Sequence, residues 1–69
     1  MSWNYRVRLT KHKGGEKSYE IIECYYYKKP NKIKARSVDA IAPHGENLKE
    51  LKRDIEYMLT ALEKPVVKS

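Results

Sequence analysis

The spacing of apolar residues changes once along this chain, and this change constrains the fold more than any other feature. From Asn47 onward, apolar residues recur at the 3.6-residue period of an α-helix. Near the start, in WNYRVRLT, they recur at every second position, the period of a strand with one buried face: Trp3, Tyr5, Val7 and Leu9. Strands followed by one helix are the pattern of an α+β domain.

Turn signals divide the first part of the chain into three predicted strands. Gly14-Gly15 follows the first strand, and glycine adopts the positive φ angles that tight hairpin turns require. The stretch KSYEIIECYYY is rich in β-branched and aromatic residues and predicts a second strand. Pro30-Asn31 marks the next turn, and IKARSVDAIA predicts a less regular third strand with a bulge near Arg36-Ser37. We expect strands over residues 3–10, 17–27 and 33–42.

One amphipathic helix is predicted over residues 47–63. Asn47 is a favourable N-cap residue, and Glu50 three places later completes a variant of the capping box. Pro65 ends the helix. The apolar residues of this helix share one side, which we expect to pack on the apolar side of the first strand: Leu48, Leu51, Ile55, Met58, Leu59 and Leu62.

Together these elements predict a three-stranded antiparallel β-meander followed by one amphipathic helix packed on one face, ββ(β)α, in a single domain over residues 1–69. One helix leaves the second face of the sheet open. A chain this short buries only about 60% of the surface that its unfolded form exposes. Cys24 is the one cysteine, so no internal disulfide can compensate. We therefore expect a homodimer, in which a second copy supplies the missing burial.

The positive charge of the chain lies almost wholly in the strand region. The net charge is +6. Residues 1–36 hold ten Lys and Arg against three acidic residues, and residues 37–69 hold five against six. This asymmetry favours an anionic partner, either RNA or DNA or an acidic protein. Charged stretches are also commonly plain solvated surfaces, and this alternative stays open.

Three consecutive tyrosines precede three lysines in CYYYKKPNK. Alternation along a strand places Tyr25 and Tyr27 on one face and Tyr26 on the other, and the strand register decides which set lies on the open face. Bases stack on tyrosine rings while Arg and Lys bind phosphates, although tyrosine is also a common strand residue and no RNP or KH motif is present. The predicted partner-binding residues combine these features: Arg6, Arg8, Tyr26, Lys28, Lys29 and Lys32.

Residue types that carry catalysis or bind metals do not form a recognisable pattern. His12 and His44 lie far apart, and neither belongs to a metal-spaced pair or a triad. Cys24 lies within a predicted strand and is interpreted as a small core residue. Gly14-Gly15 precedes a strand and not a helix, so it does not match a phosphate-binding loop. We expect no enzyme activity, no catalytic residue, no metal, no cofactor and no small-molecule substrate.

The expected location is cytoplasmic. No run approaches the roughly 18 apolar residues of a membrane-spanning helix. The first ten residues carry arginines where a signal peptide would have its apolar core. A single cysteine suits a reducing compartment. Because no apolar run is long enough to span a membrane, we expect no membrane partner.

Both ends of the chain resemble a group of short bacterial proteins of unknown function, which begin with a W-N-Y-R-V-like strand and end with a helix rich in leucine. More distantly, the meander followed by GENLKEL resembles the N-terminal domain of HicB-type antitoxins, which masks a small RNase toxin. That resemblance implies a regulatory protein acting through protein–protein contacts, although a basic surface suits a basic toxin poorly. The positions that match the first group are residues 3–7, Gly45, Glu46, Leu48, Glu50, Leu51, Asp54, Met58, Leu59, Ala61, Leu62 and residues 64–66.

Overall fold

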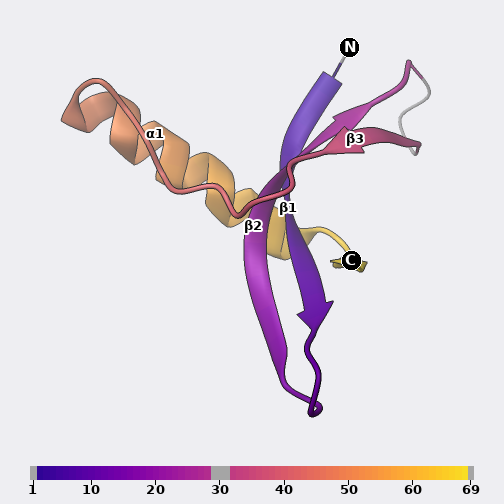
Figure 1. The fold of residues 1–69 in the computed structure, drawn as a ribbon. Coiled ribbons are helices and arrows are strands. Elements are labelled where there is room, and N and C mark those ends of the chain that lie inside the picture. The colour runs from indigo at the N-terminus through magenta and orange to yellow at the C-terminus, as the bar shows by residue number, and fades with distance from the viewer. Residues whose placement is uncertain (1, 29–31, 69) are drawn as a thin grey trace.

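The computed structural model describes residues 2–28 and 32–68 and has an α+β fold (Figure 1). Within these residues the sheet has four strands in the order β3-β2-β1-β4. The first three strands pair antiparallel as predicted, but the last strand runs parallel to β1, so the expectation of a purely antiparallel three-stranded sheet is wrong. The elements are β1 (Ser2–Lys11), β2 (Lys17–Tyr26), β3 (Ile33–Arg36), α1 (Leu48–Leu59), the 3₁₀ turn η1 (Thr60–Glu63) and β4 (Val67–Lys68).

The β1–β2 hairpin is the longest pairing in the sheet, and the sequence predicts it correctly. It runs in unbroken register from Ser2 opposite Tyr26 to Lys11 opposite Lys17. Gly14-Gly15 forms the turn with φ angles of 95° and 91°, which residues with a Cβ rarely adopt. This hairpin forms the long twisted ribbon in Figure 1.

Strand β3 is shorter than predicted. It ends at Arg36, whereas we expected a strand to residue 42. The reason lies at Ser37: its N–H donates to the Glu23 carbonyl at 2.9 Å, but its side-chain hydroxyl accepts the Glu23 N–H at 3.0 Å. A side chain thus takes the place of a backbone carbonyl, and the ladder stops. The irregularity expected near Arg36-Ser37 lies instead opposite the step between Tyr25 and Tyr26.

Two small apolar clusters lie on opposite faces of the curled sheet. The cluster on the helix side contains Tyr5, Val7, Met58 and Ala61. The second face is not left open as expected, because the curl of the sheet and the C-terminal strand β4 cover a second cluster there. That cluster consists of Ile22, Cys24, Tyr26 and Val67, with Ile33 packed against it.

Helix α1 begins where the sequence predicts, but little of its predicted apolar side packs on the sheet. Asn47 Oδ1 accepts the Glu50 N–H at 2.9 Å, so the predicted N-cap is confirmed. Within α1 only Met58 is buried. The prediction that the apolar side of the helix packs on β1 holds only for Met58, which lies against Tyr5 and Val7, and four of its other five residues are exposed. Figure 1 shows why: α1 projects away from the sheet, and only its C-terminal half, from Asp54 onward, contacts β1.

The chain after α1 turns back toward the sheet. The 3₁₀ turn η1 ends before Pro65, as the proline predicts, and Lys64 is extended. Strand β4 then pairs with Arg8 and Leu9 of β1. Across residues 2–28 and 32–68, no helix combines the length and apolar character needed to cross a membrane.

Candidate functional site

Three arginines share the sheet face that carries Cys24. Arg6 and Arg8 lie at alternate positions of β1, and Arg36 of β3 pairs with Cys24 across the ladder. Because partners in a ladder point to the same side, all three guanidinium groups extend over this face. Glu20 is the single acidic residue that strands β1–β3 place there, so the face keeps a positive charge. We call Arg6, Arg8 and Arg36 the basic face.

Arg6 holds the C-terminal segment against the sheet. Its Nη2 and Nε atoms donate to the Pro65 carbonyl at 2.6 and 3.1 Å, and its Nη1 donates to the Tyr26 hydroxyl at 3.0 Å. Tyr26 in turn donates to Asn4 Oδ1 at 2.7 Å. All three guanidinium nitrogens are therefore engaged within the protein, and Arg6 is half-buried.

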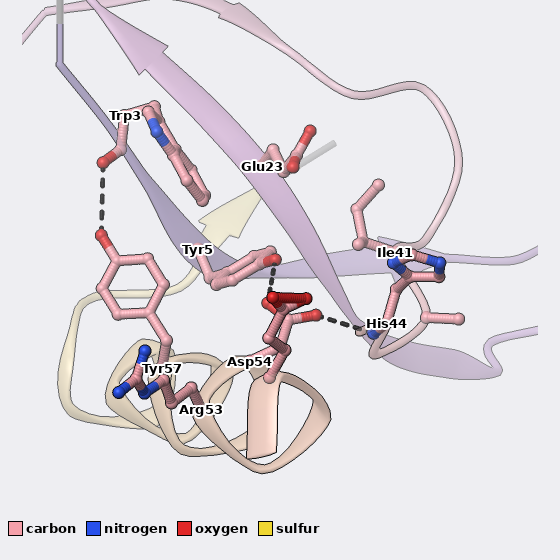
Figure 2. A pocket seen from close by; sticks show the side chains of 10 residues that line it. Trp3, Tyr5, Glu23, Ile41, His44, Arg53, Asp54 and Tyr57 are labelled. Carbon is pink, nitrogen blue, oxygen red and sulfur yellow. Dashed lines mark hydrogen bonds between the residues drawn. The ribbon is translucent and has the colours of Figure 1, made fainter. Parts of the chain in front are cut away.

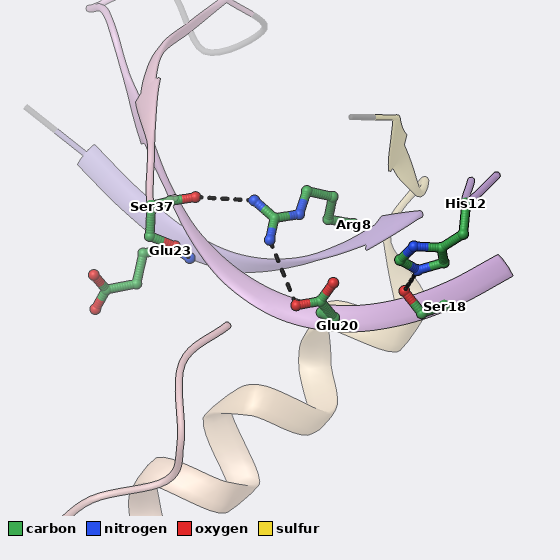
Figure 3. Close-up of polar contacts among 6 residues, drawn as sticks. All are labelled: Arg8, His12, Ser18, Glu20, Glu23 and Ser37. Carbon is green, nitrogen blue, oxygen red and sulfur yellow. Dashed lines mark hydrogen bonds and ion pairs between the residues drawn. The ribbon is translucent and has the colours of Figure 1, made fainter. Parts of the chain in front are cut away.

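Arg8 contacts two segments of the chain, and one of its three guanidinium nitrogens has no partner among the described residues. Its Nη1 donates to the Ser37 carbonyl at 3.2 Å, and its Nη2 lies 3.5 Å from Glu20 Oε2 (Figure 3). Its side chain is only 13% exposed. Within the described part of the chain, the buried Nε of Arg8 has no hydrogen-bond partner. An unpaired buried donor is costly to the stability of the fold.

Arg36 is the exposed member of the basic face. Its Nη1 donates to the Lys68 carbonyl at 2.9 Å. Together with Arg8, Ser37 and Val38 it lines a shallow hollow of about 330 Å³. Two guanidinium groups at one hollow can bind the oxygens of a phosphate or a carboxylate through paired hydrogen bonds.

The structure places the predicted binding residues in different settings. Tyr26 is buried in the second cluster and offers no ring surface for stacking, and the side chain of Arg8, also a predicted binding residue, is mostly buried. Lys28 and Lys32 are exposed at the end of the sheet where β2 leads to β3. Lys29 lies outside the described residues.

The sequence analysis missed the residue that β3 contributes to the basic face. Arg36 joins Arg8 only through the β2–β3 register, which residue alternation alone does not supply. Tyr27, about half-exposed, carries Lys34 over its ring at 6.0 Å from the centroid. The exposed tyrosine of the CYYY run is therefore Tyr27 and not Tyr26. Tyr27 follows the last residue of β2, whereas we expected this strand to include residue 27, so the sequence did not single it out.

A second hollow, of about 570 Å³, lies between the helix and the other face of the sheet (Figure 2). Three aromatic rings line it and pack edge to face, with centroid separations of 5.2 to 5.5 Å: Trp3, Tyr5 and Tyr57. Edge-to-face ring pairs add stability beyond that from burying apolar surface, so this cluster helps to fix α1 against β1.

Asp54 ties three segments together beside these rings. Its Oδ1 accepts the Tyr5 hydroxyl at 2.6 Å, and its Oδ2 accepts the His44 N–H at 2.8 Å. The Tyr5 hydrogen bond holds the pKa of Asp54 below its ordinary value. Burial, followed by the same hydrogen bond, raises the pKa of Tyr5. A carboxylate held in this way is a structural anchor more than a proton carrier.

The remaining reactive side chains are dispersed. Cys24 is fully buried, and burial raises the pKa of its thiol. Throughout residues 2–28 and 32–68, no three His, Cys, Asp or Glu side chains form a group that could hold a metal ion. His12 is exposed and contacts Ser18, with the two side chains 2.8 Å apart (Figure 3).

Comparisons of the chain with protein-family models, with curated proteins and with solved structures give no match.

Proposed function

We propose that this chain is a non-catalytic cytoplasmic interaction module that binds the phosphate backbone of RNA or DNA through its basic face. The observation that carries the proposal is the shallow hollow lined by Arg8 and Arg36, two guanidinium groups on one positively charged face of the sheet. A phosphate group bound there would neutralise part of the local positive charge and accept charge-assisted hydrogen bonds.

Exposed lysines add positive charge beyond the Ile33 end of β3. Lys28 and Lys32 are exposed where β2 leads to β3, so a polyanion longer than one phosphate could contact them as well as Arg36. No element of this face is shaped to read base edges. We therefore expect binding without sequence specificity, with a dissociation constant on the order of 10⁻⁴–10⁻⁶ M at physiological salt.

Charge reversal at the exposed arginine tests this proposal. Arg36→Glu removes one hydrogen bond to the Lys68 carbonyl and places a carboxylate at the hollow. Arg53→Glu is the matched control, because it makes the same charge change on an exposed helical position. Fluorescence anisotropy with a short labelled oligonucleotide, scanned from low to physiological salt, measures both variants.

We expect Arg36→Glu to weaken binding at every salt concentration and Arg53→Glu to change it much less. Equal losses in the two variants would mean that only net charge matters, and absence of binding at low salt would exclude a nucleic-acid role. An acidic protein partner is then the remaining anionic partner.

A specific observation also supports the alternative of a HicB-like regulatory protein that acts through protein–protein contacts. The outer side of α1 exposes apolar side chains that no described residue covers. Binding through such a surface depends little on salt, whereas phosphate binding weakens steeply as counterions are released. The salt scan therefore separates the two functions.

A further inference from the structure

The outer side of α1 and η1 carries a row of apolar residues that the fold does not bury. We call this row the helix stripe: Leu48, Leu51, Ile55, Leu59 and Leu62. Four of its members are exposed, from 42% at Ile55 to 84% at Leu48, while Met58 and Ala61 take the side that faces the sheet. A contiguous exposed apolar surface of this kind marks an interaction site.

The spacing of the helix stripe is symmetric. Successive members are separated by three, four, four and three residues, so the pattern reads the same in both directions about Ile55. In a two-fold dimer, residue i of one copy meets residue j of the other, and j meets i. An antiparallel second copy would therefore place Leu48 on Leu62, Leu51 on Leu59, and Ile55 on itself.

Charged residues beside the stripe follow the same symmetry. On the flank turned away from the sheet, Lys49 and Lys52 lie in the first half of the helix, and Glu56 and Glu63 lie in the second half. A lone helix favours the reverse order, with acidic residues near its N-terminus and basic residues near its C-terminus. Among the described residues, none of these four takes part in an ion pair.

An antiparallel partner gives this order of charges a physical reason. The basic half of one helix would lie along the acidic half of the other, bringing Lys49 near Glu63 of the second copy and Lys52 near Glu56. The apolar spacing is thus symmetric about Ile55, and the two charge pairs are centred within one residue of it. An unrelated partner would require neither form of symmetry.

We propose that α1 pairs antiparallel with α1 of a second copy of this chain, with Ile55 at the two-fold axis. The projection of α1 away from the sheet leaves its outer side accessible to another helix (Figure 1). Separations of three and four residues suit helices that cross at about 20°. This proposal is independent of nucleic-acid binding, which uses the basic face of the sheet.

Cross-linking tests the direction and the register of the pair. Ile55→Cys should give a covalent dimer with a short thiol cross-linker, because the two copies of this residue meet at the axis. Leu48→Cys alone should not, whereas Leu48→Cys combined with Leu62→Cys should. The buried Cys24 thiol serves as the built-in background control in the wild type. A parallel pair would cross-link through Leu48→Cys alone, and that result would overturn the proposal.

Charge exchange tests the predicted contacts in solution. Sedimentation at high micromolar concentration should show a wild-type dimer. Ile55→Glu should give a monomer, since two carboxylates would meet at the axis, and its far-UV circular dichroism should be unchanged because the site is outside the core. Lys49→Glu should weaken the dimer about tenfold, and adding Glu63→Lys should restore most of the loss. A monomeric wild type, or a dimer indifferent to Ile55→Glu, would contradict the proposal.

Discussion

The hydroxyl of Tyr5 donates a 2.6 Å hydrogen bond to Oδ1 of Asp54 and so connects β1 directly to α1 (Figure 2). Because the other carboxylate oxygen accepts the His44 N–H, the loop before the helix is fixed by the same side chain. Only the end of the helix packs on apolar residues of the sheet, so this polar contact has an unusually large share in setting the helix position.

The first prediction follows from this hydrogen bond. Tyr5→Phe keeps the ring packing but removes the donor to a charged acceptor, so we expect a loss of about 1.5–3 kcal/mol in the free energy of unfolding. Urea denaturation measures it. Tyr25→Phe is the matched control, because Tyr25 also donates to a carboxylate, that of Glu23, but only within its own strand. A loss of less than about 0.5 kcal/mol in Tyr5→Phe would show that the contact to Asp54 contributes little.

The second prediction concerns acid stability. The hydrogen bond from Tyr5 lowers the pKa of Asp54 in the folded state, so the unfolded chain takes up a proton first as the pH falls. The stabilisation is therefore full above the unfolded-state pKa of about 3.9 and is lost as the pH falls through the lower folded-state pKa. The melting temperature of the wild type should fall over this interval, and that of Asp54→Asn should fall less. Identical pH profiles of the two proteins would contradict the assignment.

The local parts of the fold could be predicted from sequence, and the side of the helix that packs could not. Alternation in WNYRVRLT and the Gly14-Gly15 turn depend on neighbouring residues, and the hairpin formed as expected. The residues of the helix stripe do recur at the helical period, as predicted. The period alone does not determine whether they face the sheet or the solvent. Met58 and Ala61 pack on the sheet because Asp54, on the same side, meets Tyr5 from a distant strand.

The candidate site also has features that could be predicted from the sequence and features that could not. Alternation correctly placed Arg6 and Arg8 on one face of β1. Their internal partners, the carbonyls of Pro65 and Ser37, come from segments far along the chain, and no local pattern indicated them. Arg36 joined the site through strand pairing, which a one-residue shift would have reversed.

The third prediction concerns the single thiol. Cys24 is fully buried, and burial raises its pKa, although the three arginines of the basic face oppose this shift. The thiolate is the reactive species, so we expect native Cys24 to react with a chromogenic disulfide reagent only as fast as the domain opens. In urea the reaction should be rapid. Fast stoichiometric reaction of the native protein would show that the second cluster leaves Cys24 accessible to solvent.

The fourth prediction concerns Gly45, which precedes α1 at very close range. A Cβ at this position would lie 2.2 Å from the Leu51 nitrogen and 2.7 Å from the Glu50 carbonyl carbon, both backbone atoms of the helix. Because a backbone cannot move aside as a flexible side chain can, Gly45→Ala should displace the first turn of α1. We expect a loss of about 1–3 kcal/mol, typical of overpacked sites, together with reduced helical circular dichroism.

Gly14→Ala provides the contrast that isolates this steric effect. A Cβ at Gly14 meets no atom within 4 Å, but the φ of 95° is unfavourable for alanine, at a cost of about 1–2 kcal/mol. Gly14→Ala should therefore lower stability while leaving the native helical signal intact, because the hairpin turn lies far from α1. Native circular dichroism and urea denaturation of both variants separate the two mechanisms. If Gly45→Ala matches the wild type in both measurements, the close approach of this loop to the helix is wrong.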